Sequence, residues 1–231
     1  MKTISPSHLL DIQAVIFDVD GLMLDTERVE RKTFVRAAAE FGFVAVEEVY
    51  VRTIGRNSAD TKRIFIEAFG SQFPYDEIRR KWRQYTEEHI AEYGVAEKAG
   101  LRELLALLST MSLPKAVATS TVREKAATLL QRSNLLDYFA VLVGGDEVSV
   151  GKPDPAIFLE AAKRLKVEPS RCLVFEDSSP GIQAAHAAGM IAVLVPDTVY
   201  PTAETIARAY RVYSSLTDAI ELLHLAAQAN G

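Results

Sequence analysis

The sequence predicts an α/β protein built on a doubly wound parallel sheet that is interrupted, after its first strand, by an all-helical insert. From residue 98 onward, short apolar runs alternate with helical patterns, and the runs are apolar at nearly every position, as in strands covered on both faces. Residues 25–97, in contrast, contain helical patterns and no clear strand. We therefore expect an α/β core of residues 1–24 and 98–231 and a helical unit of residues 25–97.

The first strand and the helices of the insert follow from residue types and helix-ending signals. Residues 12–17 are rich in β-branched and aromatic types and contain no Gly or Pro, which predicts a buried strand. Asp25 or Thr26 can cap a helix that runs to about Phe41, where Gly42 supplies a stop. Two more helices are predicted in the insert, over residues 58–70 and 74–93.

The rest of the chain repeats one pattern, a helix followed by a short apolar strand, and ends in a helix. The predicted helices cover residues 101–108, 123–132, 155–165, 180–188 and 216–227. The predicted strands cover residues 115–118, 138–143, 172–175 and 191–195. Because strands joined through helices run parallel, we expect their carboxyl ends to lie along one edge of the sheet.

Composition and charge argue against several classes of protein. Of 231 residues, 48% are hydrophobic and 25% charged, as in soluble globular proteins, and the net charge of −5 argues against a nucleic-acid binder. No apolar run approaches the roughly 18–20 residues that span a bilayer, and the first residues lack the apolar core of a secretory signal. The single cysteine, Cys172, lies in an apolar run, which indicates a buried thiol and a reducing compartment. We expect a cytoplasmic monomer without nucleic-acid or membrane partners.

Two carboxylates follow the first strand directly. Asp18 and Asp20 are two residues apart on an extended chain, so their side chains point into the same space. Such a pair is typical of a divalent metal site or of acid/base chemistry beside a nucleophile. It is also compatible with an Asp-Gly turn, because Gly21 follows, and the stretch alone does not decide between these readings.

The other strand ends are polar in a complementary way. Thr119-Ser120-Thr121 follows one strand, Gly151-Lys152-Pro153-Asp154-Pro155 lies downstream of the next, and Glu176-Asp177 follows a third. Taken singly, the hydroxyls and carboxylates could be helix caps, and the lysine could be solvated. Ligands of doubly wound sheets bind beyond the carboxyl ends of the strands, so these groups converge on one crevice. Together they fit a metal ion and a phosphate.

The expected chemistry is phosphoryl transfer assisted by Mg²⁺, a hard cation that prefers oxygen ligands. Asp18 and Asp177 fit as metal ligands, with Glu176 in support and Asp20 contributing through its carbonyl oxygen. Asp18 is placed to attack phosphorus and form an aspartyl-phosphate, while Asp20 protonates the leaving oxygen and then activates water. Thr119 and Lys152 hold the phosphoryl oxygens. The expected phosphate site is completed by Gly21 and Ser120.

These residues resemble the haloacid dehalogenase-like hydrolase superfamily over almost the whole chain. Its four motifs appear in order as Asp18-Val19-Asp20-Gly21, Thr119, Lys152 within Gly-Lys-Pro-Asp-Pro, and Glu176-Asp177-Ser178. The position of the helical insert is similar to that of the C1 cap, which in this family closes over the crevice and selects the substrate. The resemblance implies that Asp18 is the nucleophile and Asp20 the acid/base, that Thr119 and Lys152 hold the phosphate, and that Asp18, Asp20 and Asp177 bind the metal.

The motifs also favour one reaction within the superfamily. Its dehalogenases lack the second aspartate and the metal, so the presence of Asp20 favours phosphoryl transfer. The motifs look most like the β-phosphoglucomutase-like branch, which also contains sugar-phosphate phosphatases. Mutases of that branch carry a histidine in the cap linker, and the position here is Glu30. We expect a phosphatase of a small phosphorylated metabolite, a sugar phosphate, with a hexose-phosphate mutase and a non-catalytic phospholigand-binding protein as the alternatives.

The insert is rich in cations that could contact the substrate. Most of them are expected on solvated helix faces. Arg56, which follows Gly55, and Lys81, beside Trp82, are predicted substrate contacts because each adjoins a turn or an apolar face. The full set comprises Arg52, Arg56, Lys62, Arg63, Arg79, Arg80, Lys81 and Arg83.

Overall fold

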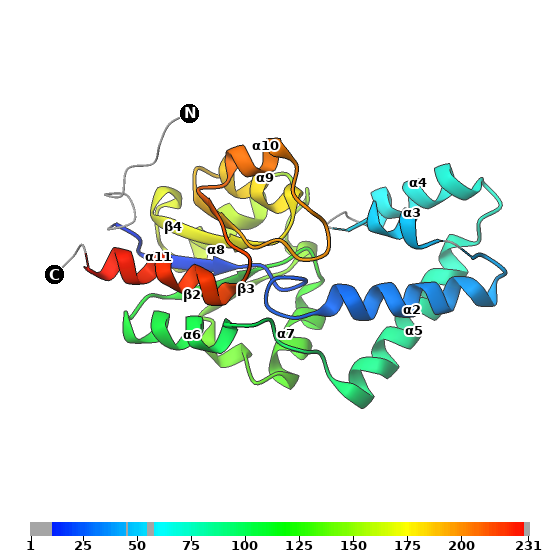
Figure 1. Ribbon diagram of the computed structural model, residues 1–231, viewed down its shortest axis with the longest axis horizontal. Helices are drawn as coiled ribbons and strands as arrows, with labels where there is room; N and C mark the ends of the chain where they lie inside the picture. The colour runs from blue at the N-terminus through cyan, green and yellow to red at the C-terminus, as the bar shows by residue number, and fades with distance from the viewer. Residues whose placement is uncertain (1–10, 45, 55–57, 229–231) are drawn as a thin grey trace.

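The computed structural model describes residues 11–44, 46–54 and 58–228. Its six strands form one parallel sheet in the order β3-β2-β1-β4-β5-β6 (Figure 1). The strand that carries the predicted carboxylate pair, β1, therefore lies near the middle of the sheet. The strands are β1 Ala14–Phe17, β2 Lys115–Ala118, β3 Val141–Val143, β4 Cys172–Glu176, β5 Ile191–Leu194 and β6 Arg211–Val212.

Helices cover both faces of this sheet, and a group of helices extends beyond its carboxyl edge (Figure 1). The extending group contains α2 Thr26–Glu40, α3 Glu47–Val51, α4 Ser58–Phe69 and α5 Tyr75–Tyr93. The helices around the sheet are α6 Leu101–Thr110, α7 Arg123–Arg132, α8 Ala156–Leu165, α9 Ser179–Ala187, α10 Ala203–Arg208 and α11 Leu216–Gln228. Short 3-10 turns lie at η1 Leu136–Tyr138, η2 Gly145–Glu147 and η3 Pro169–Arg171.

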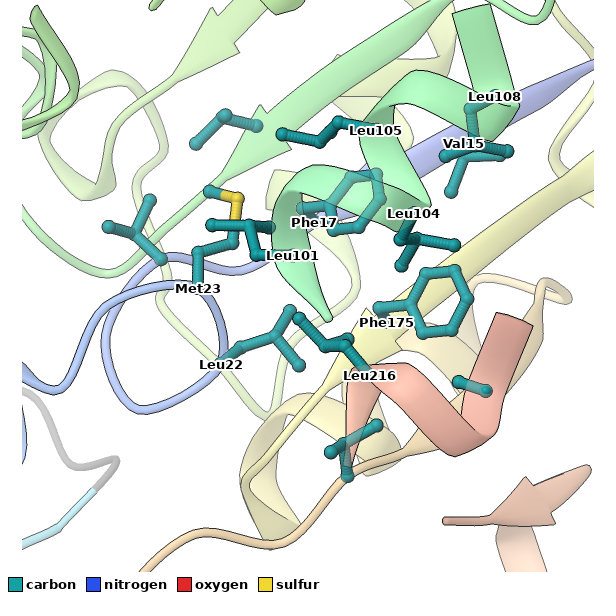
Figure 2. Close-up of a cluster of buried hydrophobic side chains, with 14 of the residues drawn as sticks. Val15, Phe17, Leu22, Met23, Leu101, Leu104, Leu105, Leu108, Phe175 and Leu216 are labelled. Carbon is teal, nitrogen blue, oxygen red and sulfur yellow. The ribbon is translucent and has the colours of Figure 1, made fainter. Parts of the chain in front are cut away.

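Alternate residues of each strand enter two different hydrophobic cores, because successive side chains of a strand point to opposite faces. Val15 and Phe17 of β1 join the core under α6, α7 and α11, where Phe17 stacks on Phe175 (Figure 2). Ala14 and Ile16 join the core under α8 and α9. Burial on both faces explains why the central strands are apolar at nearly every position, as predicted from the sequence.

The helices α2 to α5 have a core of their own. Phe34 of α2 contacts three other aromatic rings in this core, those of Tyr50, Phe65 and Trp82, at 4.7–5.3 Å between ring centroids. Two chain segments join this unit to the sheet, and their backbones pair. The Asp25 N–H donates to Ala96 O and the Lys98 N–H to Met23 O, each at 2.9 Å. This aromatic core explains why the insert can fold as a compact unit beside the sheet.

Two short helices and one strand were missed from sequence, and the strands predicted over residues 12–17, 138–143 and 191–195 were each too long at one end. The missed elements are α3, α10 and β6, which are too short to display a period, and the two residues of β6 are exposed. Residues 138–140 were predicted as strand, but Tyr138 ends the η1 turn and residues 139–140 follow it; Phe139 packs edge-on against Phe17 at 5.9 Å between ring centroids. An apolar residue of a loop can thus pack into the core, and the pattern of apolar residues in the sequence does not distinguish such a loop from a strand.

The structure also bears on the predictions made for Cys172 and for membrane-spanning segments. Cys172 is buried in β4, as predicted, and burial raises the pKa of its thiol to about 11, so the thiol is unreactive at neutral pH. None of the helices described here is both long and apolar enough to cross a membrane.

Candidate active site

A cavity of about 490 Å³ lies between the carboxyl edge of the sheet and the helices α2 to α5. Its floor comes from the loops that follow β1, β2 and β4 and from the segment that precedes α8. The convergence predicted from the strand ends is therefore present in the structure. The predicted residues that line the cavity are Asp18, Asp20, Thr119, Ser120, Lys152, Glu176 and Asp177.

Lys152 is the buried centre of this floor. Its ammonium group donates to Asp18 Oδ1 and Glu176 Oε1, both at 2.6 Å, and to Ala118 O at 3.2 Å. Burial alone would lower the pKa of Lys152, but the charges of Asp18 and Glu176 raise it overall, so the side chain stays protonated. Lys152 is thus a fixed cation and not the solvated lysine that was the alternative reading.

Glu176 fixes both Lys152 and the loop after β4. One of its oxygens binds Lys152, and Oε2 accepts hydrogen bonds from the Ser178 N–H at 2.8 Å and the Ser178 hydroxyl at 2.9 Å. Gly181 lies against this carboxylate so closely that a Cβ there would be 1.8 Å from Glu176 Oε1. Ser178, not Glu176 or Asp177, is the N-cap of α9, so the capping alternative for these two acids is wrong.

Three carboxylates meet the geometric requirement for a metal site. Among the described residues, Asp18, Glu176 and Asp177 bring one oxygen each within 4.8 Å of one another. Burial raises the pKa of Asp18 to about 7, against the attraction of Lys152, and burial raises the pKa of Asp177 well above its ordinary value. Buried carboxylates that repel one another are relieved by a cation, and an all-oxygen set fits Mg²⁺.

Gly21 allows Asp177 to approach the first loop. Its φ of +80° is unfavourable for other residues, and a Cβ at this position would lie 2.3 Å from Asp177 Oδ2. Gly21 does not appear among the residues that line the cavity, so the phosphate contact predicted for it gains no support from the structure. The observed role of this glycine is to leave space for a carboxylate.

Asp20 is held by hydroxyl groups, and its side chain is not part of the group of three clustered carboxylates. Its Oδ1 accepts a hydrogen bond from Thr26 at 2.8 Å, and its Oδ2 accepts from Thr121 at 2.7 Å and from Thr119 at 3.4 Å. Sequence reasoning treated Thr26 only as a possible helix cap and assigned no separate role to Thr121. The signal for Thr121 was its spacing, two residues after Thr119 at a strand end.

The hydroxyls that follow β2 belong to the site and not to a helix cap. The N-cap of α7 is Val122, which makes no side-chain capping bond, so the capping alternative for Thr119 and Ser120 is wrong. The Thr119 side chain is fully buried, and its hydroxyl accepts a hydrogen bond from the Thr121 N–H at 3.1 Å. The loop is thereby fixed beside Asp20.

The two substrate contacts predicted in the insert are not supported. Arg56 lies outside the described residues. Lys81 turns away from the cavity, since its Nζ lies 3.7 Å from Glu40 and 5.5 Å from the centre of the Tyr85 ring. Arg79 and Arg83 line the cavity instead, because residues four apart share a helix face that Lys81, midway between them, cannot join.

Two acids of α2 also line the cavity. Burial, with repulsion from nearby carboxylates, raises the pKa of Glu27 to about 9 and that of Glu30 to about 8. Asp20 adds to the shift of Glu30, whereas Lys125 and Arg83 oppose it. Both acids lie in the first turns of α2 and line the cavity together with the predicted catalytic groups, and sequence reasoning assigned neither of them to the site.

Glu30 is expected to make the folded state less stable as the pH rises. Because its pKa is raised by folding, the protonated acid stabilises the fold below its ordinary pKa of 4.5, and this contribution is lost as the pH rises through about 8. We expect Glu30→Gln to raise Tm by several degrees at pH 9 and to leave it nearly unchanged at pH 5. Differential scanning calorimetry at both pH values measures this, with Glu103→Gln, at an exposed position, as control. Equal shifts at both pH values would contradict the prediction.

Comparison with known proteins assigns the fold and the four motifs to a family. The sequence profile of the family described as haloacid dehalogenase-like hydrolase matches residues 15–195, which include every motif named above. The chain belongs to the haloacid dehalogenase-like hydrolases. This confirms the resemblance that the carboxylates, hydroxyls and lysine at the strand ends indicated.

The relatives of this hydrolase include named phosphatases. The phosphorylated carbohydrates phosphatase of Thermotoga maritima is 34% identical over 218 residues, which is 94% of this chain and 93% of that protein. The fructose-1-phosphate phosphatase YqaB of Escherichia coli is 31% identical over 179 residues, which is 78% of this chain and 94% of that protein. The crystal structure of CbbY from Rhodobacter sphaeroides in complex with phosphate has a TM-score of 0.77 and 27% identity, covering 92% of this chain and 99% of that one.

Proposed function

We propose that this chain is a Mg²⁺-dependent phosphatase that hydrolyses a small phosphorylated carbohydrate through an aspartyl-phosphate. The observation that carries the proposal is the Asp18 carboxylate, which is held 2.6 Å from a buried ammonium group at the floor of the cavity. Asp177 lies close enough to share a cation with Asp18, whereas the Asp20 side chain is outside that group and is bound by hydroxyls. These different surroundings support Asp18 as the nucleophile, Asp177 as a metal ligand and Asp20 as the acid/base.

The first step forms a bond between a carboxylate oxygen of Asp18 and phosphorus and breaks the bond to the leaving alcohol oxygen. Lys152 and Thr119 would bind the phosphoryl oxygens as charge develops on them. Mg²⁺, held by Asp18 and Asp177, would supply further neutralisation of that charge. Glu176 would act through Lys152, since both of its oxygens are already hydrogen-bonded.

Asp20 would move the proton in both steps. In the first step it donates its proton to the leaving oxygen, which departs as a neutral alcohol. In the second step it accepts a proton from water, whose oxygen attacks phosphorus, releases inorganic phosphate and restores the Asp18 carboxylate. The hydroxyls of Thr26 and Thr121 would fix the direction in which Asp20 points.

The substrate class rests on the cavity and on the relatives. A volume of about 490 Å³ suits a small metabolite, and the walls carry hydroxyl, guanidinium and carboxyl groups suited to a sugar. Two relatives are named for phosphorylated carbohydrates and for fructose 1-phosphate. We further propose that residues 25–97 act as the cap that selects the substrate, and that the protein is a cytoplasmic monomer.

The proposal is tested by phosphate release from a panel of sugar, nucleotide and glycolytic phosphates with Mg²⁺. We expect release to be fastest with one or more sugar phosphates and to stop when EDTA is added. β-Glucose 1-phosphate belongs in the panel, because its conversion to glucose 6-phosphate without free phosphate would identify a mutase. No turnover of any member would favour a binding protein.

The hydroxyl of Thr121 offers a test of the role of Asp20. We expect Thr121→Val to lower kcat about 10- to 100-fold at nearly constant KM, because a charge-assisted hydrogen bond at 2.7 Å that aims the acid/base is lost. Thr121→Ser keeps the hydroxyl and is expected to retain most of kcat. Steady-state kinetics of both variants on the best panel substrate decide the point; wild-type kcat in Thr121→Val, which keeps the methyl group and loses only the hydroxyl, would contradict the role of the hydroxyl.

A further inference from the structure

Asp197, in the loop after β5, has a buried oxygen without a partner. Its side chain is 10% exposed, and its Oδ1 accepts a hydrogen bond from Lys98 at 2.5 Å. Its Oδ2 is buried and makes no hydrogen bond within the described part of the chain. A buried carboxylate oxygen is unfavourable unless a donor or cation satisfies it, so a group that is not part of the protein is expected there.

The unpaired oxygen lies beside the proposed metal ligands. The position that a Cβ of Gly21 would occupy is 3.4 Å from Asp197 Oδ2 and 2.3 Å from Asp177 Oδ2. Both oxygens therefore lie on the same side of the Gly21 backbone. Lys98 holds the opposite oxygen of Asp197 and so fixes the side chain in this orientation.

Glu27 presents a second buried oxygen to the same region. It lies in the first turn of α2 and lines the cavity, and its Oε2 likewise has no hydrogen-bond partner among the described residues. Its electrostatic neighbours include Asp18, Asp20 and Asp197. Among these acids the ionised form of Glu27 is unfavourable unless something positive or hydrogen-donating lies between them.

We propose that Glu27 Oε2 and Asp197 Oδ2 accept hydrogen bonds from water ligands of the divalent cation held by Asp18 and Asp177. The inference rests on the metal site of the proposed function. Neither Glu27 nor Asp197 belongs to the group of carboxylates close enough to share one ion directly, so their contact with the ion is through water. Mg²⁺ retains several waters in proteins, and groups that orient these waters raise its affinity.

This arrangement explains the placement of both acids. The waters would fill the space between Glu27, Asp197 and Asp177 and supply the missing donors. The ion would neutralise the acids that now face one another. Because Glu27 lies on the first helix of the cap unit and Lys98 on its return segment, the hydration shell would connect the ion to both segments that join the cap to the core.

The affinity of the protein for Mg²⁺ tests the inference. Isothermal titration of Mg²⁺ into Glu27→Gln and into Asp197→Asn is expected to give dissociation constants about 10- to 100-fold weaker than wild type. Asp25→Asn is the matched control: Asp25 carries the same charge and also has a buried oxygen without a hydrogen bond, but its Oδ1 lies 3.6 Å from Lys98 and its Oδ2 lies 3.1 Å from Arg28, so both oxygens already lie near a cation of the protein. We expect the dissociation constant of Asp25→Asn for Mg²⁺ to stay within about 2-fold of wild type, because this variant loses one negative charge but no acid that orients the waters of the ion.

A second measurement separates the water contacts from a structural role. With Mn²⁺ in place of Mg²⁺, water-proton relaxation is expected to show the same number of bound waters in Glu27→Gln as in wild type, but faster exchange. Wild-type affinity and exchange in both variants would overturn the inference and leave the proposed function intact. Failure of the wild type to bind either ion would overturn both, and Asp18→Asn serves as the reference for a damaged inner site.

Discussion

Replacement of Asp18 with asparagine is expected to lower kcat by at least about 10³-fold while leaving the fold unchanged. The amide is nearly isosteric with the carboxylate, but it is a poor nucleophile and cannot form the acyl phosphate. The Asp18 side chain lines the cavity and is held by the buried Lys152 ammonium group, so the substitution removes the proposed attacking group while leaving its surroundings in place. Phosphate release from the best panel substrate measures the loss.

The fold of Asp18→Asn is checked by far-UV circular dichroism and thermal unfolding. Lys152 keeps Glu176 and Ala118 O as partners in this variant, so we expect only a modest change in Tm. Mass spectrometry of acid-quenched wild type is expected to show a phosphorylated protein that is absent in the variant. Turnover of the variant within tenfold of wild type would refute Asp18 as the nucleophile.

Replacement of Lys152 with methionine is expected to affect activity and stability together. We expect kcat to fall about 10²- to 10³-fold, because a buried cation that would bind the phosphoryl oxygens is lost. The variant also leaves Asp18 and Glu176 buried without their cation, and breaking a buried ion pair destabilises proteins by about 3–5 kcal/mol. Urea unfolding in EDTA measures the change in the free energy of unfolding.

The pH dependence of this loss identifies its cause. Unpaired carboxylates are neutralised by protonation, so the destabilisation by Lys152→Met is expected to shrink as the pH falls from 8 to 5. Lys163→Met is the control, since Lys163 is exposed and pairs with Glu160 at 3.5 Å on the surface. We expect no measurable loss of activity or stability in that control. A destabilisation by Lys152→Met that is constant with pH would indicate lost packing instead.

Much of the fold and of the site floor was predictable because both depend on local patterns. Strands β1 to β5 are apolar at nearly every position because both of their faces are buried, and the glycines that end helices mark where the chain must turn. In a parallel sheet, polar residues just past the strands must meet at one edge. For this reason Asp18, Thr119, Lys152 and Asp177 were found from sequence without knowledge of their distances.

Spacing alone did not predict which side chains of the insert face the cavity. Arg79, Lys81 and Arg83 look alike in sequence, and the face of α5 that packs on Phe34 decides that Lys81 points away. That face is chosen by contacts between α2 and α5, elements separated by tens of residues. A helical period gives the residues that share a face but not the direction in which that face points.

The sequence by itself determined the sheet, the helical insert and the acids, hydroxyls and lysine that form the floor. Only the tertiary structure decided the partner of each: Glu176 with Lys152, Asp20 with Thr26 and Thr121, and Asp197 beside Gly21. The physical reason is distance along the chain. Thr121 lies 101 residues after Asp20, and a hydrogen bond between two such residues depends on the packing of every element between them.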